Sequence, residues 1–133
     1  MLDDFIFDKI YNGICKIISY KIKPNMIIEN VTDLSTEILY KLKENNIKIL
    51  IVDVDETLRF DMKPLNNVNI EWLKSTNDII KIVVVSNGYD KAVEEVLNKL
   101  GIAYYKMSCK PLKFNLKKVL SNLNIDGENA MFI

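Results

Sequence analysis

The sequence contains no histidine. This absence excludes Ser-His-Asp and Cys-His catalysis and removes the commonest nitrogen ligand for zinc, so any metal would be held by oxygen ligands. Cysteine is scarce: Cys15 and Cys109 lie far apart and form no CxxC pair, which argues against a disulfide framework or a zinc site and fits a reducing cytosol. Eighteen basic residues balance eighteen acidic ones, so the composition predicts no nucleic-acid partner.

Signals for export and for nucleotide binding are also missing. The N-terminus carries Asp3 and Asp4 instead of a basic region, and charged residues interrupt its apolar stretch, so we expect no signal peptide or membrane span and a cytoplasmic location. Neither GxxxxGK[ST] nor GxGxxG occurs, which disfavours P-loop and Rossmann nucleotide sites. The length of 133 residues fits one domain. We divide it into an N-terminal helical segment at 1–30 and an α/β core at 31–133.

Short β-branched runs are what the sequence does contain. The runs at 47–54 (IKILIVDV) and 79–85 (IIKIVVV) are typical of strands buried on both faces of a parallel sheet. Further strands are expected at 102–105 and 130–133, and Pro111 suits the first turn of the helix between them. Strand and helix therefore alternate, which predicts an α/β fold, a Rossmann-like parallel sheet with helices on both faces. The expected helical faces are Leu34, Ile38, Leu39 and Leu42; Val93, Val96, Leu97 and Leu100, stopped by Gly101; and Leu112, Leu116, Val119, Leu120 and Leu123.

The first thirty residues leave two alternatives open. Several isoleucines fall near one helical face, which predicts either a helix that packs on the domain or a helix that binds a membrane surface or a partner. The mixed charges of this segment favour the first alternative. The isoleucines are Ile6, Ile10, Ile14, Ile17 and Ile18.

Three acidic residues, Asp53, Asp55 and Glu56, directly follow or end the first predicted strand. They could simply cap a turn. In a parallel sheet, however, ligands bind beyond the carboxyl ends of the strands, so we expect Asp53 and Asp55 to share a crevice with Ser86 and Asn87, which follow the second strand. Two neighbouring carboxylates repel one another unless a cation lies between them, and Mg²⁺ prefers carboxylate, water and phosphate oxygens. The sequence therefore predicts a magnesium site.

Three motifs carry a resemblance to a known family. DVDETL at 53–58 resembles the DxDxT signature of the haloacid dehalogenase (HAD) superfamily, and Ser86 in VVVSNG and Lys110 in CKPL match its second and third motifs in chain order. The resemblance covers about residues 25 to 133. Within the superfamily, the sequence most resembles the capless subfamily IIIA, and in it the YqeG-type phosphatases, which are related to phosphatidylglycerophosphate phosphatases.

This resemblance implies a magnesium-dependent phosphomonoester hydrolase that acts through an aspartyl-phosphate. Its substrate would be a phosphorylated small molecule or a lipid head group such as phosphatidylglycerophosphate, the latter with peripheral membrane contact. Asp53 would be the nucleophile and a metal ligand, Asp55 the general acid/base with its backbone carbonyl on the metal, and Lys110 would stabilise the phosphoryl charge. The implied phosphate-binding residues are Thr57, Ser86 and Asn87.

The sequence departs from the family pattern at its end. The fourth family motif is an acidic loop after a short apolar strand, and the sequence stops at Ile133 on that strand. We therefore expect a core truncated after the fourth strand, a weakened metal site, and an apolar strand edge that pairs with a second copy of the chain. Two alternatives remain: a catalytically impaired binding or scaffold module, and a phosphoryl-accepting signalling domain, which Asp55 and the SNG motif disfavour. The segment after Thr57 is too short for a cap domain, and Trp72 and Leu73 in it are expected in the core.

Overall fold

The computed structural model describes residues 27–106 and 113–133. Most of the predicted N-terminal helical segment, both cysteines, Pro111 and Lys110 lie outside the described residues. Residues 27–30 are not helical, and a one-turn 3-10 helix, η1 (Val31–Asp33), follows them.

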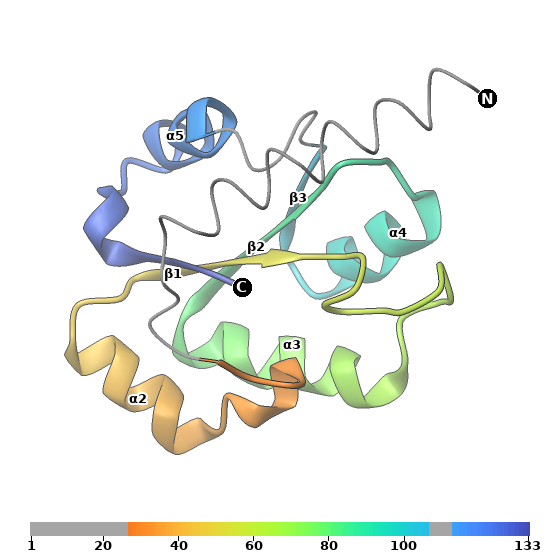
Figure 1. The fold of residues 1–133 in the computed structure, drawn as a ribbon, viewed down its shortest axis with the longest axis horizontal. Helices are drawn as coiled ribbons and strands as arrows, with labels where there is room; N and C mark the ends of the chain where they lie inside the picture. Colours follow the sequence, from red (N-terminus) through yellow and green to blue (C-terminus); the bar gives the residue numbers. More distant parts are fainter. Residues whose placement is uncertain (1–26, 107–112) are drawn as a thin grey trace.

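The described part of the chain forms a four-stranded sheet with the order β3-β2-β1-β4. All strands are parallel, and β1 lies in the centre between β2 and β4, as Figure 1 shows. The predicted parallel α/β fold is therefore confirmed. The strands are β1 (Ile49–Asp53), β2 (Lys81–Ser86), β3 (Ala103–Lys106) and β4 (Ala130–Phe132).

Helices cover both faces of this sheet. One face packs against side chains from three of the helices, and the other face packs against the C-terminal helix, which Figure 1 shows on the opposite side from the first two. The helices of the first face are α2 (Thr36–Glu44), α3 (Asn67–Ile79) and α4 (Lys91–Lys99). The helix of the second face is α5 (Lys113–Asn122), which is followed by a second 3-10 turn, η2 (Gly127–Asn129).

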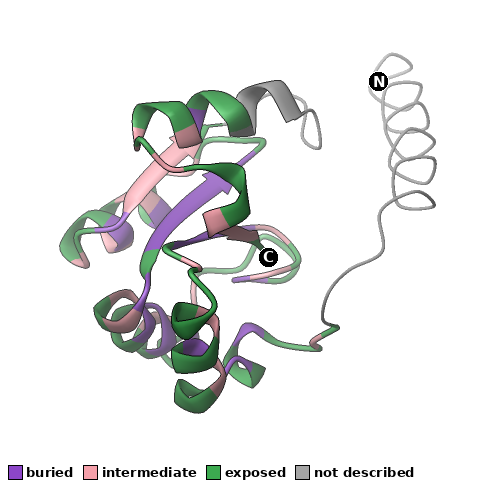
Figure 2. Ribbon diagram, turned by 90° about the vertical axis from the view of Figure 1, so that its left-hand side faces the viewer, coloured by how far each residue is buried: buried purple, intermediate pink, exposed green. Residues whose placement is uncertain are grey.

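The alternation of side chains along β1 explains why its sequence is apolar throughout. Leu50 and Val52 belong to the core cluster under α2, α3 and α4, whereas Ile49 and Ile51 belong to the cluster under α5. All four are at most 2% exposed, and Figure 2 shows the central strands buried between helices with exposed outer sides. A strand covered on both faces needs apolar residues at every position.

The predicted helix around Val93 and Leu97 is α4, and its end has the expected cause. Gly101 adopts a left-handed conformation with φ +68°, and the Ile102 N–H donates to the Leu97 carbonyl at 2.9 Å. This pattern closes a helix whose C′ residue must take a positive φ. Asp90 is the N-cap of the same helix, and its Oδ1 accepts hydrogen bonds from the N–H groups of Ala92 and Val93 at 2.9 and 3.3 Å.

The segment before the second strand differs most from the prediction. The second strand begins at Lys81, because Ile79 is the last residue of α3 and belongs to the preceding helix. The helix α3 was not itself predicted, since its buried face includes the polar side chains of Asn69 and Thr76, which interrupt the apolar periodicity. Trp72, which is 8% exposed, lies in the core as expected. Residues 54–66 form a loop, so the segment between β1 and β2 holds this loop and one helix and no separate cap domain.

Candidate active site

The carboxyl ends of β1 and β2 place the main candidate residues at one edge of the sheet. Asp53 ends β1 and pairs with Val85 of β2, so Ser86 lies one residue further along the neighbouring strand. Chain connections run from β1 through β2 to β3 on one side, and the chain then returns to β4 on the other side of β1. Asp53 therefore ends the strand at which the sheet reverses its direction of winding, which is where open α/β sheets bind ligands.

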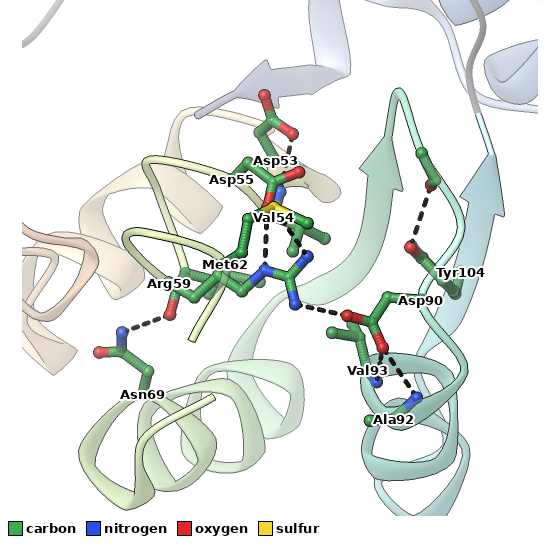
Figure 3. Close-up of polar contacts among 12 residues, drawn as sticks. Asp53, Val54, Asp55, Arg59, Met62, Asn69, Asp90, Ala92, Val93 and Tyr104 are labelled. Carbon is green, nitrogen blue, oxygen red and sulfur yellow. Dashed lines mark hydrogen bonds and ion pairs between the residues drawn. The ribbon is translucent and has the colours of Figure 1, made fainter. Parts of the chain in front are cut away.

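Asp53 is held by hydrogen bonds at both its backbone and its side chain. Its N–H donates to the Ile133 carbonyl at 3.0 Å, and its Oδ1 accepts from the Val54 N–H at 2.7 Å. The first contact fixes the end of β1 against β4. The second orients the half-buried carboxylate at the strand end, as Figure 3 shows.

The loop after β1 is a tight turn that carries Asp55 and Thr57. The Val54 carbonyl accepts hydrogen bonds from the N–H groups of Leu58 and Arg59 at 2.9 and 3.1 Å. Glu56 has φ 59°, a left-handed conformation that L-residues adopt at an energetic cost. The turn is therefore locally strained, and it needs contacts with the rest of the domain to keep its shape.

Two such contacts come from α3 and α4. The buried side chain of Asn69 donates from Nδ2 to the Leu58 carbonyl at 2.8 Å. Arg59 donates from Nε to Oδ1 of Asp55 at 2.8 Å and from Nη1 to Oδ2 of Asp90 at 2.6 Å. Figure 3 shows the guanidinium between the two carboxylates, with Asp55 on the loop after β1 and Asp90 at the start of α4.

Burial and hydrogen bonds act in opposite directions on the pKa values of Arg59 and Asp90. The Arg59 side chain is 4% exposed, whereas those of Asp55 and Asp90 are 40% and 30% exposed. Burial alone would lower the pKa of Arg59, but hydrogen bonds to Asp90 and Asp55 raise it above the ordinary value. The hydrogen bond from Arg59 holds the pKa of Asp90 below its ordinary value, against the opposite effect of burial. Arg59 and Asp90 therefore form a charged ion pair at neutral pH.

A pair of tyrosines lies beside the loop that follows β2. The rings of Tyr89 and Tyr104 stack with their centroids 6.4 Å apart, and the Tyr104 hydroxyl donates to the Gly88 carbonyl at 3.3 Å. The Tyr89 hydroxyl donates to Glu94, and this hydrogen bond raises the pKa of Tyr89. These contacts support the loop that carries Asn87.

The structure thus brings most of the predicted residues to one edge of the sheet. Asp53 and Ser86 end their strands, Asp55 and Thr57 lie in the loop after β1, and the exposed Asn87 follows β2. Their chemical roles stay predictions, and Lys110 lies outside the described residues.

Arg59 and Asp90 were missed by the sequence analysis. One signal could have found the first: Arg59 is the chain's only arginine, and it follows Asp55 by four residues. Nothing local marks Asp90, because it is 31 positions away from Arg59 along the chain.

The described ranges were also searched for other sites. In residues 27–106 and 113–133 no group of three or more Asp, Glu, Cys or His side chains is arranged to hold a metal ion. No helix among the described residues is long and apolar enough to cross a membrane.

Comparison of the sequence with known proteins gives one informative match. No protein-family model matches the chain. It is similar to the probable phosphatase YqeG of Bacillus subtilis (strain 168), with 29% identity over 112 residues. The match covers 83% of this chain and 63% of that protein, so the chain spans less than two thirds of the relative's length.

Comparison of the fold gives solved structures at low sequence identity. The cobalt-bound deoxy-D-mannose-octulosonate 8-phosphate phosphatase of Haemophilus influenzae matches with a TM-score of 0.54 and 20% identity, over 68% of this chain and 59% of that one. A Legionella pneumophila structure described as a HAD superfamily (subfamily III A) hydrolase matches with a TM-score of 0.51 and 21% identity, over 74% and 62% of the two chains. Because both identities are below 25%, these matches concern the fold.

Proposed function

Because this chain has the haloacid dehalogenase-like fold, we propose that it is a phosphatase that hydrolyses phosphate monoesters with the help of a divalent metal ion. The observation that carries the proposal is the position of Asp53 at the end of the central strand β1, beside the end of β2 where Ser86 lies. The similarity to a probable phosphatase supports the same reaction class.

In the proposed mechanism an Asp53 carboxylate oxygen attacks phosphorus, and the ester P–O bond breaks. Asp55 gives a proton to the leaving oxygen, so the products are an alcohol and an aspartyl-phosphate. Asp55 then takes a proton from water, which attacks phosphorus. The bond between phosphorus and Asp53 breaks, and inorganic phosphate leaves.

The phosphoryl oxygens would be held by the loops at the same edge. Ser86 is the last residue of β2, Asn87 follows it, and Thr57 lies in the turn after β1. The Ser86 hydroxyl and the Asn87 backbone would bind the phosphoryl oxygens, and Thr57 would brace the turn. Donors fixed in position stabilise charge that develops in the transition state without having to reorganise. Lys110 completes the proposed set as a cation beside the phosphoryl group.

The donors at this edge fit a hard divalent ion. The Asp53 carboxylate and the backbone carbonyl of Asp55 would supply oxygen ligands, and Mg²⁺ is commonly bound by one or two carboxylates together with water and substrate phosphate. When bound, the ion screens the repulsion between a phosphate and Asp53. That repulsion is roughly 4 kcal/mol for unit charges about 4 Å apart at an effective dielectric of 20. We propose Mg²⁺ as the ion.

For the substrate we propose a phosphate carried by a large group, with a lipid head group as the leading class and a phosphorylated small molecule as the other. Support comes from the segment between β1 and β2, which is a loop and a helix packed on the sheet. Phe60, Met62 and Val68 in this segment are 46%, 71% and 66% exposed, and such side chains suit an apolar substrate body or peripheral contact with a membrane.

The second candidate is a binding or scaffold module that keeps the fold and lacks turnover. Within residues 27–106 and 113–133 no third Asp, Glu, Cys or His joins two others in a metal-holding group. A metal ion that needs three side-chain ligands would not find them there, and this observation favours the second candidate.

The test is hydrolysis of p-nitrophenyl phosphate and glycerol 3-phosphate by the chain and its Asp53→Asn variant, with and without Mg²⁺. We expect magnesium-dependent release of phosphate by the chain and a loss of at least about 10²-fold in the variant, because an amide is a far weaker nucleophile. Circular dichroism serves as the control for folding. Equal turnover by both proteins would reject Asp53 as the nucleophile, and turnover by neither would reject the phosphatase and favour the scaffold.

A further inference from the structure

Arg59 makes polar contacts to two loops at the carboxyl edge of the sheet. Nε donates to Asp55 in its own turn, and Nη1 donates to Asp90 across the gap between the two loops. Nη2 donates to the Met62 sulfur at 3.7 Å. All three guanidinium nitrogens therefore have partners within the protein, and the side chain is 4% exposed.

Asp90 is fixed independently of Arg59. Its Oδ1 caps α4 through the N–H groups of Ala92 and Val93, and its Oδ2 accepts from Arg59. A helix cap gives Asp90 a fixed position on a rigid element. Arg59 bonds both Asp90 and Asp55, so it connects the fixed start of α4 to the turn that is strained at Glu56.

We propose that Arg59 is a positioning residue: it holds the carboxyl group of Asp55 in place by connecting the turn after β1 to the start of α4. The inference rests on the proposed function, in which Asp55 gives its proton to the leaving group. Arg59 itself would not touch the substrate, because its side chain is 4% exposed and donates to Asp55, Asp90 and Met62.

Arginine suits this task better than lysine does. The planar guanidinium presents donors in a fixed fork, so it can bind two carboxylates from different directions at the same time. A lysine keeps the charge, but its three donors share a single nitrogen at the end of a flexible stem. Without Arg59, the 40% exposed side chain of Asp55 would be free to take other rotamers.

Loss of the contact between Arg59 and Asp55 should affect only those substrates whose leaving group needs a proton. An alkyl phosphate such as glycerol 3-phosphate releases a basic alkoxide and depends on the acid, whereas p-nitrophenyl phosphate releases a stable phenolate and does not. A displacement of about 1 Å can cost about 10²-fold in rate. Loss of the positioning contact should therefore lower the ratio of alkyl to aryl turnover.

The experiment compares kcat and KM for both substrates in the chain and in Arg59→Met, Arg59→Lys and Asp90→Asn. Asp90→Asn keeps an amide oxygen for the helix cap but removes the carboxylate that accepts from Arg59, so it should fold even where Arg59→Met does not. The matched control is Lys41→Met, which breaks an ion pair of the same 2.8 Å length and the same four-residue spacing, with both partners exposed.

We expect Arg59→Met to lower the alkyl-to-aryl ratio of kcat by about 10- to 100-fold with little change in KM. Asp90→Asn should lower the ratio several-fold, Arg59→Lys should restore part of the Arg59→Met loss, and Lys41→Met should match the parent chain. If both substrates lose the same factor, Arg59 only stabilises the fold and the inference is wrong, while the phosphatase proposal stands. If the parent chain shows no Asp53-dependent turnover, the phosphatase proposal fails and the inference fails with it.

Discussion

The two oxygens of Asp90 have different partners, so two substitutions separate its roles in stability. Asp90→Asn keeps the cap of α4 and removes the ion pair, whereas Asp90→Ala removes both. A charge-assisted hydrogen bond contributes about 1.5–3 kcal/mol, and we take the lower part of this range because Asp90 is 30% exposed. A cap contributes about 1 kcal/mol more.

We therefore expect Asp90→Asn to lower the free energy of unfolding by about 1–2 kcal/mol and Asp90→Ala by about 2–3 kcal/mol. Each kcal/mol corresponds to about 3–4 °C in Tm for a chain of this length. The assay is urea unfolding followed by the fluorescence of Trp72, the chain's only tryptophan, which is buried. Glu37→Gln at the exposed ion pair is the control and should cost less than about 0.5 kcal/mol.

The same variants give a pH dependence whose sign is fixed by the lowered pKa of Asp90. A carboxyl with a lowered pKa contributes stability that is fully present above its unfolded value, about 3.9, and is lost as the pH falls through the folded value. The gap in unfolding free energy between the parent chain and Asp90→Asn should thus be constant from about pH 7 to 5 and shrink at lower pH. A gap that is zero at pH 7, or one that widens in acid, would refute the role of this ion pair.

Two further stability predictions concern α3 and the end of α4. Thr76 Oγ1 is buried and has no hydrogen-bond partner among the described residues, so Thr76→Val should raise the unfolding free energy by about 1 kcal/mol; a lower Tm in calorimetry would contradict this. Gly101 has φ +68° and open space where a Cβ would lie, so Gly101→Ala should cost about 1 kcal/mol through backbone strain alone. An unchanged Tm in that variant would show that the turn after α4 adapts without strain.

The sequence predicted the fold where local chemistry determines it. The apolar runs that became β1 and β2 are covered on both faces, and the glycine at position 101 ends α4 as expected. The helix α3 escaped prediction because its buried positions include Asn69, whose amide bonds the loop after β1. A hydrogen bond of this kind depends on tertiary contacts and leaves no trace in the apolar periodicity.

Some residues of the candidate site could be predicted from the local sequence, and others depend on contacts between distant parts of the chain. Asp53, Asp55 and Ser86 could be placed from the sequence because strand ends in a parallel sheet meet at one edge. The link from Arg59 to Asp90 could not, because it depends on how the start of α4 lies against the turn after β1. The loop that carries Asn87 is likewise supported by a tyrosine pair from different elements, Tyr89 and Tyr104.

The most direct test of the central claim is a thermal-shift titration of the chain and of Asp53→Asn with Mg²⁺ plus vanadate. Vanadate is an analogue of the phosphoryl group in the transition state of its transfer. The titration needs no choice of substrate. The account predicts stabilisation that requires both additives, about 2.7 kcal/mol at a hundred times the dissociation constant, and its loss in Asp53→Asn. No stabilisation of the chain, or the same stabilisation in the variant, would contradict a phosphoryl site built around Asp53.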